Sequence, residues 1–358
     1  MNILYIGLES SNWVINLCNN FCNKGHKVTC VVQGLDEYDK ENPIERHKNL
    51  EVIYIPYETF LNPLEFRKQR FYHFIDKNFD VIFGSHVFIA PVVQLLGETL
   101  GKPWGLMLLD IPTHLMRVER QRMKSWSVYF DILKRADAII FNNHVARDEY
   151  ERYTGIRLPD SCVITYGTNL IDKFQNSGID KKGDYIISVC RLISQKNCSL
   201  IPKALGLINC IKKYVAVGID QGELEYIKRL CELHNIEFVH YDNVTEKKKF
   251  ELIRDSAMMV YPQNTEFIGG LSPWEGMFVG KPVVVSRLKV LSDLYKENAV
   301  YFENDNSLSL AKEISFLYNI KPELTRPLRE KASEFTKHEA SFKTMSEKLL
   351  KVIERMVK

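Results

Sequence analysis

Two glutamates and two adjacent glycines stand close together in the second half of the chain. Glu266 and Glu275 flank the stretch Gly269-Gly270-Leu271, and apolar runs that read as buried strands lie on either side. Carboxylates accept hydrogen bonds from hydroxyl groups, and glycines let a backbone approach a ligand closely. These residue types in this order predict a site for a compound that carries hydroxyl groups.

A helix is expected to begin directly after the glycines. Ser272 suits the N-cap and Pro273 the first helical position, which places Glu275 in the first turn. Unpaired N–H groups and the positive end of the helix dipole would then face the glycine loop, and both favour an anion there. A phosphorylated sugar fits this description. The simpler alternative for Glu275 is a carboxylate that only interacts with the helix dipole.

An arginine and a lysine five residues apart follow another predicted strand. The stretch Asp184–Val189 reads as the strand, and Arg191 and Lys196 come just after it. A guanidinium offers a planar fork of donors to phosphate oxygens, and lysine adds a mobile point charge. Alone, the pair carries little information. Combined with the glycine loop, it predicts a phosphate-binding site.

Two polar residues in the first half also follow predicted strands. His86 comes just past the strand Asp80–Gly84, and Asp110 ends the strand Trp104–Leu109. Ligands gather at the carboxyl ends of parallel strands, so both residues are candidates for a site. The alternative is that each simply caps a strand end.

Short apolar runs alternate with helical stretches along the whole chain. Strands separated by helices favour parallel sheets covered by helices on both faces. The loop Gly7–Ser11, after the first strand, lacks the GxGxxG pattern of dinucleotide-binding folds. We therefore expect an α/β, doubly wound fold whose strands cover residues 2–6, 27–32, 51–55, 80–84, 104–109, 137–141, 162–166, 184–189, 214–218, 236–240, 257–261, 282–285 and 299–303.

Composition narrows the class of protein. The 358 residues leave room for two domains, and 45% hydrophobic with 26% charged residues is typical of a globular protein. The net charge of +3 gives little reason to expect nucleic acid. No apolar run reaches the roughly 20 residues that a membrane helix needs, and the N-terminus enters a strand rather than a signal peptide. The eight cysteines form no CxxC pair, which fits a reducing cytoplasm.

The glycine loop and the residues after it resemble the donor site of retaining GT-B glycosyltransferases, particularly glycosyltransferase family 4. In that family two glutamates flank a glycine loop, and the second leads into Ala-Met-Ala-x-Gly-x-Pro-Val. This chain continues in the same way over Glu275–Val284, EGMFVGKPVV. The first glutamate is out of register by one residue, because strict alignment places Phe267 there. We assume a one-residue loop insertion that lets Glu266 still reach the site.

The resemblance implies two Rossmann-like doubly wound domains that face a central cleft, with a C-terminal helix crossing back to the first domain. The expected divisions are an acceptor-binding domain over residues 1–170, a donor domain over 171–336, and the returning helix over 337–358. A helix with an apolar stripe over the last 18 residues agrees with this arrangement, although a surface helix of the second domain explains the stripe nearly as well.

Roles for the candidate residues come from the same resemblance. Arg191 and Lys196 would clamp the donor diphosphate together with Gly269, Gly270 and Leu271. Glu275 would accept the ribose hydroxyls, and Glu266 would hold the transferred sugar or stabilise an oxocarbenium-like transition state. His86 would touch the sugar, and Asp110 would contact the acceptor hydroxyl or act as a base. The main chain at Asn243 and Val244 would contact the base.

The expected reaction is the transfer of a sugar from a UDP- or GDP-sugar to a hydroxyl acceptor with retention, by a hexosyltransferase of surface-glycan or glycoconjugate synthesis. No Asp-x-Asp metal motif occurs in the chain, so no metal cofactor is expected. The acceptor would be a glycan, a lipid-linked compound or another hydroxyl compound, and nucleic acid is not an expected partner. The basic segments 67–77 and 117–124 are either solvated faces or contacts with a membrane surface at its inner, cytoplasmic side.

Two other functions stay open. A related GT-B sugar phosphorylase or phosphate synthase would keep the fold and a similar site. A catalytically degenerate binding or partner protein would keep the fold without turnover, and the shifted first glutamate and the plain loop after the first strand favour it.

Overall fold

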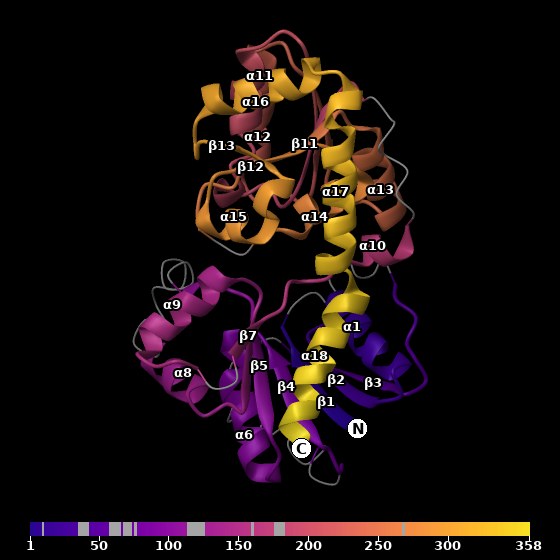
Figure 1. Ribbon diagram of the computed structural model, residues 1–358, viewed down its shortest axis with the longest axis vertical. Helices are drawn as coiled ribbons and strands as arrows, with labels where there is room; N and C mark the ends of the chain where they lie inside the picture. Colours follow the sequence, from indigo (N-terminus) through magenta and orange to yellow (C-terminus); the bar gives the residue numbers. More distant parts are fainter. Residues whose placement is uncertain are drawn as a thin grey trace. The chain divides into compact units, whose positions relative to one another are not determined.

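A computed structural model describes residues 1–8, 11–34, 43–56, 66, 74, 77–112, 126–158, 161–174, 183–266 and 269–358 of the chain. It divides into two compact units (Figure 1). Unit 1 comprises Met1–Tyr166 and Phe342–Lys358, and unit 2 comprises Gly167–Ser341. The last helix therefore belongs to the first unit.

Unit 1 is built on a sheet of seven parallel strands in the order β3-β2-β1-β4-β5-β6-β7. The central strands β1, β4, β5 and β6 carry nearly continuous buried runs, because the middle of a parallel sheet is covered on both faces, whereas the edge strands β3 and β7 are mostly half-buried. The elements in chain order are β1 (Asn2–Gly7), α1 (Ser11–Asn23), β2 (Lys27–Val32), β3 (Leu50–Tyr54), β4 (Val81–Ser85), η1 (Val87–Ile89), α6 (Ala90–Leu100), β5 (Trp104–Leu108), α8 (Trp126–Leu133), β6 (Ala138–Phe141), α9 (His144–Thr154), β7 (Ser161–Val163) and α18 (Phe342–Val357).

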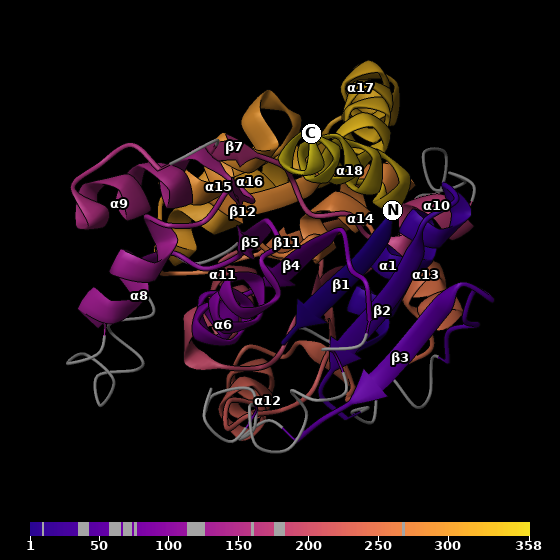
Figure 2. The same ribbon diagram turned by 90° about the horizontal axis from the view of Figure 1, so that it is seen from below.

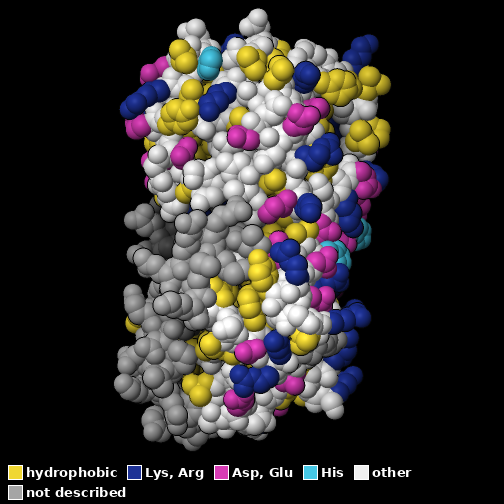
Figure 3. All heavy atoms as spheres, turned by 90° about the vertical axis from the view of Figure 1, so that its left-hand side faces the viewer, with side chains coloured by type: hydrophobic (Ala, Val, Ile, Leu, Met, Phe, Trp, Pro, Cys, Tyr) yellow, Lys and Arg dark blue, Asp and Glu magenta, His cyan; other side chains and the backbone are white. Residues whose placement is uncertain are grey.

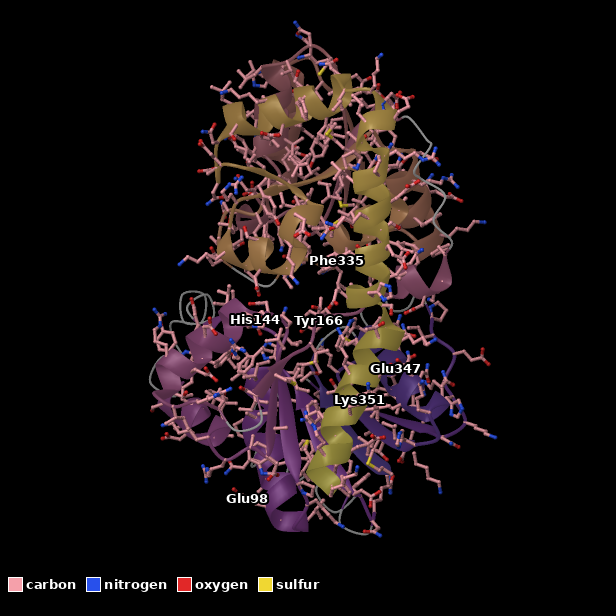
Figure 4. All side chains as sticks on the ribbon, viewed as in Figure 1. Glu98, His144, Tyr166, Phe335, Glu347 and Lys351 are labelled. Carbon is pink, nitrogen blue, oxygen red and sulfur yellow. The ribbon has the colours of Figure 1, made fainter. Side chains whose placement is uncertain are left out.

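Helices cover the two faces of this sheet, with α6 on one side and α1 and α18 on the other (Figure 2). The apolar stripe of α18 is buried there, with Phe342 against Trp13 at a ring distance of 5.7 Å. Trp13 also meets Tyr166, labelled in Figure 4, edge to face. At the rim, Lys24, the residue after α1, pairs with Glu347 of α18 at 2.7 Å. The C-terminal helix thus completes the core of unit 1.

Unit 2 repeats the plan with six parallel strands in the order β10-β9-β8-β11-β12-β13. Its elements are α10 (Asn169–Lys173), β8 (Ile186–Val189), η3 (Ser194–Lys196), α11 (Leu200–Gly206), β9 (Lys213–Val217), α12 (Leu224–Leu233), β10 (Glu237–Tyr241), α13 (Glu246–Asp255), β11 (Met258–Tyr261), α14 (Leu271–Val279), β12 (Val283–Ser286), α15 (Lys289–Tyr295), η4 (Lys296–Asn298), β13 (Val300–Phe302), α16 (Ser307–Asn319) and α17 (Pro322–Ala340). The predicted doubly wound α/β class is confirmed in both units.

The order of the strands reverses once in each sheet. In unit 1 the chain leaves β1 towards β2 on one side and takes up β4 on the other, and in unit 2 the same happens at β8 and β11. Ligands of open α/β sheets bind beyond the carboxyl ends of the strands at such switch points. The loops after β8 and β11 carry Arg191, Lys196 and the glycine pair, and the loop after β4 carries His86.

The start of α14 differs from the sequence prediction. The helix begins at Leu271 with Gly270 as N-cap, so Ser272 is not the cap and Pro273 is not the first helical residue. The hydroxyl of Ser272 instead donates to the carbonyl oxygen of Val189, at the end of β8. This hydrogen bond joins the first turn of α14 to the end of β8. Ser272 would have to give it up in order to cap the helix.

Within the described residues, no helix combines the length and hydropathy that crossing a bilayer would require. The basic segments 67–77 and 117–124 lie outside the described residues, apart from Phe74 and Lys77. On the face shown in Figure 3, described Lys and Arg side chains are interspersed with Asp and Glu. This mixture agrees with the small net charge of +3.

Candidate active site

Lys196 is a buried cation at the carboxyl end of β8. Only 7% of its surface is exposed, and its Nζ donates to Gln263 Oε1 at 2.7 Å and to the Tyr261 hydroxyl. The Tyr261 hydroxyl in turn donates to Gln263 Oε1 at 3.1 Å. Burial lowers the pKa of Lys196 to about 8, because the charged form loses its hydration, and the Arg191 charge acts in the same direction. An anion that reached this ammonium would replace the lost hydration.

Arg191 lies at the start of the same segment, with its guanidinium exposed. Its Nη1 is 3.4 Å from Gln221 Oε1, an exposed contact beyond the end of β9. The pair predicted from the sequence is therefore arranged as one buried and one exposed cation on the loop that follows β8. This geometry suits a ligand with two anionic groups, one deeper than the other.

The glycine pair is packed so closely that a side chain at either position would force a neighbouring side chain to shift. A Cβ at Gly269 would lie 2.1 Å from Leu294 Cδ1, and one at Gly270 would lie 2.5 Å from the Tyr261 hydroxyl oxygen. The Tyr295 hydroxyl donates to the Gly270 carbonyl at 2.7 Å, which fixes the loop. From the sequence, these glycines are predicted to permit close approach of a ligand. The structure adds a second reason, which is close approach of α15 and β11.

Glu275 lies in the first turns of α14 and is 3% exposed. Its Oε1 accepts hydrogen bonds from Lys249 Nζ and from Thr168 Oγ1, each at 2.9 Å. The helix is held by Trp274, which packs against Phe335 of α17 at a ring distance of 5.6 Å (Phe335 is labelled in Figure 4). Lys249 and Thr168 share one carboxylate oxygen, so together they orient the second one.

Glu266 has a clear structural role in this conformation. Its two carboxylate oxygens accept from the backbone N–H groups of Lys289 at 2.7 Å and Val290 at 3.0 Å. These are the first two residues of α15, so Glu266 supplies that helix with two of the partners that its first turn lacks. Its predicted contact with the transferred sugar stays a prediction.

Asn243 and Val244 follow β10, at the same edge of the sheet. The Asn243 side chain accepts from the Val244 N–H at 3.1 Å, and Thr245 caps α13 through Lys248 N. The predicted contact of this turn with a base is not tested by these hydrogen bonds. The turn does lie beyond a strand end, as the donor residues do.

In unit 1, His86 and Asp110 come together. They follow the adjacent strands β4 and β5, and His86 Nε2 lies 2.8 Å from Asp110 Oδ2. His86 Nδ1 accepts from the Phe88 N–H at 3.2 Å, so the neutral ring carries its proton on Nε2, facing the carboxylate. His86 has φ of 88°, a conformation that non-glycine residues seldom adopt. Strain of this kind clusters at functional sites.

Three of the supporting side chains were not predicted from the sequence. Lys249 stands in a run of three lysines, and nothing in the sequence separates it from its solvated neighbours. Tyr261 and Gln263 read as a strand end and a loop residue. Their roles depend on contacts across 65 and 67 residues of chain, which no local pattern signals. Among the described residues, no group of three His, Cys, Asp or Glu side chains is placed to hold a metal ion.

Comparison with known proteins identifies the family. Residues 171–338 match the family model described as glycosyl transferases group 1, and residues 10–170 match the one described as glycosyltransferase family 4. No curated protein matches the sequence significantly.

Solved structures share the fold over the whole chain. A sucrose-phosphate synthase of Thermosynechococcus elongatus is 18% identical with a TM-score of 0.81 and 99% of each chain covered. HepE of Anabaena in complex with UDP is 17% identical with a TM-score of 0.77, covering 99% of this chain and 100% of that one. A glycosyltransferase of Rickettsia africae is 15% identical with a TM-score of 0.78, covering 100% and 98%.

Proposed function

The chain belongs to the group 1 glycosyltransferases, and we propose that it moves a sugar from a UDP- or GDP-sugar to a hydroxyl acceptor with retention and without a metal ion. The acceptor would be a glycan, a lipid-linked compound or another hydroxyl compound. The observation that carries the proposal is the buried Lys196 beside the exposed Arg191 at the switch point of unit 2.

The leaving group of this reaction is a nucleoside diphosphate, whose developing charge has to be stabilised. Arg191 and Lys196 would supply the positive charge, and the N–H groups at the start of α14 would add hydrogen bonds. A divalent ion performs this task in many other transferases, and here the two side chains would perform it. Burial makes the Lys196 charge costly without a ligand, so the diphosphate gains more from it than from a hydrated lysine.

Lys249 and Thr168 both donate to Oε1 of Glu275 and so orient its carboxylate. Glu275 would accept the ribose hydroxyls with its other oxygen, Oε2. A carboxylate suits a vicinal diol because its two oxygens offer about four lone-pair positions. The turn at Asn243 and Val244 would meet the base through main-chain atoms.

His86 and Asp110 would serve the sugar and the acceptor. Asp110 is 6% exposed, and its carboxylate lies beside the histidine ring, so it would be held in place to receive a hydrogen bond from an acceptor hydroxyl. His86 would contact the sugar. Glu266 would hold sugar hydroxyls if its contacts with α15 leave an oxygen available.

The donor is tested by calorimetric titration and thermal shift with UDP, GDP, ADP and CMP and their sugar conjugates, each with magnesium and with a chelator. UDP comes first because the structurally similar HepE was solved with UDP and with UDP-glucose. At a hundredfold excess over Kd, binding should stabilise the protein by about 2.7 kcal/mol. The gain should persist with the chelator.

Arg191→Ala should abolish the gain, and Arg229→Ala provides the matched control, because Arg229 is an exposed arginine of the same unit on α12. No response to any nucleotide would overturn the transferase proposal and favour a degenerate binding protein. Binding without transfer or hydrolysis would point to the same conclusion. Product formation with phosphate or a sugar phosphate as acceptor would instead favour a phosphorylase or a phosphate synthase.

A further inference from the structure

Two cysteines bracket the segment that carries the proposed phosphate clamp. Cys190 follows β8 and precedes Arg191, and Cys198 lies two residues after Lys196. Their Sγ atoms are 3.3 Å apart, so they would have to approach by roughly 1.3 Å to reach the S–S bond length of about 2.05 Å. The sulfur atoms of this pair already point at each other across the base of the loop.

We propose that Cys190 and Cys198 are a redox modification site, whose disulfide weakens diphosphate binding by the loop between them. The effect on binding rests on the proposed function of Arg191 and Lys196. The bond itself rests only on the two sulfur atoms.

The surroundings of the two thiols give them different reactivity. A hydrogen bond from Cys190 lowers the pKa of Cys198, and the hydroxyls of Ser188 and Tyr214 and the charge of Lys196 act in the same direction against burial. The same hydrogen bond, together with burial, raises the pKa of Cys190. Cys198 is therefore the sulfur that ionises more readily, and thiolates are the attacking species in disulfide formation.

Exposure assigns the order of steps when the oxidant is a hydroperoxide. Cys190 is partly exposed and Cys198 is fully buried. Cys190 reacts as its thiolate, and its raised pKa makes this the slow step. The Cys190 sulfur attacks the terminal peroxide oxygen, the O–O bond breaks, and the alkoxide takes up the thiol's proton and leaves as an alcohol. The Cys198 sulfur then displaces water from the Cys190 sulfenic acid and forms the S–S bond. Two thiols lose two protons and two electrons, and the hydroperoxide becomes an alcohol and water.

The backbone decides which end of the loop moves. Cys190 N donates to Val217 O at 2.9 Å, and Cys190 O lies so close to Gly218 that a Cβ there would be 2.1 Å from it, so the strand end is held against the end of β9. The movement falls on the turn η3, whose C-cap residue Asn197 lies in the left-handed region with φ of 51°. This turn carries Lys196. Closing the bond would therefore displace the buried ammonium from its place beside Tyr261.

The test compares reduced and oxidised full-length protein. After treatment with hydrogen peroxide, peptide mass mapping should find Cys190 linked to Cys198, and the Kd for UDP should rise by about tenfold, the factor that loss of one charge-assisted hydrogen bond brings. A dithiol reductant should reverse both changes. Cys190→Ser and Cys198→Ser should each keep UDP affinity in peroxide, whereas Cys210→Ser, which removes a partly exposed thiol of the same unit, should respond like the natural chain.

Each outcome bears on one part of the proposal. Failure to find the linkage after peroxide would overturn the modification site. A linkage with unchanged UDP affinity would overturn its effect while leaving the transferase proposal intact. A reduced protein that binds no nucleotide would overturn the proposed function and the switching effect together, and the mass map would still decide whether the bond forms. Melting temperatures of the serine variants identify any that fail to fold.

Discussion

The affinity of the protein for a nucleoside diphosphate should fall as pH rises through the pKa of Lys196. Burial places that pKa at about 8 in the ligand-free protein. If only the ammonium form binds the diphosphate, Kd scales with one plus the ratio of neutral to charged lysine. Between pH 7 and pH 9 this factor rises about tenfold, because each pH unit above the pKa removes about nine-tenths of the charged form. Binding at pH 8 should take up about half a proton, since the diphosphate favours the charged lysine.

Calorimetric titration with UDP in buffers of different ionisation enthalpy measures both quantities. The terminal phosphate of the nucleotide loses its second proton near pH 6, so the range from pH 7 to 9.5 leaves the ligand dianionic there. Lys196→Met should bind more weakly with a flatter pH dependence, and the ratio of the two Kd values cancels any titration of the base. Lys196→Arg keeps its charge throughout this range and should also lose the dependence. A natural chain whose affinity relative to Lys196→Met stays constant from pH 7 to 9.5 would refute the reasoning.

Four further outcomes are expected. Relative to Lys196→Met, the free energy of unfolding of the ligand-free protein should rise with pH between about 8, the lowered pKa of Lys196, and 10.5, its ordinary pKa. In this range the unfolded chain keeps the lysine proton that the folded protein has lost. Chemical denaturation at several pH values measures this. Lys249→Met should cost about 3–5 kcal/mol by leaving the Glu275 charge buried without its cation, and Lys249→Met with Glu275→Gln should recover part of this in urea denaturation. Gly270→Ala should cost about 1–3 kcal/mol and weaken UDP binding, because its Cβ would meet the Tyr261 hydroxyl; an unchanged melting temperature and Kd would contradict this. Glu266→Gln should cost about 1 kcal/mol through weaker contacts with the first turn of α15, again by denaturation.

The architecture could be predicted from the sequence because each of its strands is a local feature. Runs such as Ile3–Ile6 and Met258–Tyr261 are apolar and buried. They are too short for a buried helix, so they favour strands that are covered on both faces. Arg191 and Lys196 could be placed because they directly follow one of these runs. The resemblance of residues 275–284 to a known motif predicted the family, which the family models confirm.

Contacts between segments that are distant along the chain could not be predicted in this way. His86 and Asp110 were each predicted at a strand end, but their contact depends on β4 lying next to β5 in the sheet. The partner of Glu275 is one of three consecutive lysines, and only the packing of α13 against α14 selects Lys249. The predicted start of α14 was wrong by two residues, because Ser272 donates to Val189 of β8 instead of capping the helix.

Glu266 is the residue for which a structural and a catalytic role compete most directly. Two of its roughly four lone-pair positions are used by the N–H groups of Lys289 and Val290, so a sugar hydroxyl could still be accepted without breaking either contact. Glu266→Gln separates the roles, because an amide keeps one acceptor oxygen and loses the charge. If the carboxylate stabilises an oxocarbenium-like transition state, kcat should fall by about 10² to 10³, far beyond the effect of a helix contact, while Kd for UDP stays unchanged. If Glu266 serves only α15, kcat should remain within about twofold once the small loss of stability, about 1 kcal/mol, is allowed for. The second result would leave the catalytic carboxylate role to Asp110 and would show that the one-residue shift in the loop has moved this glutamate from chemistry to support.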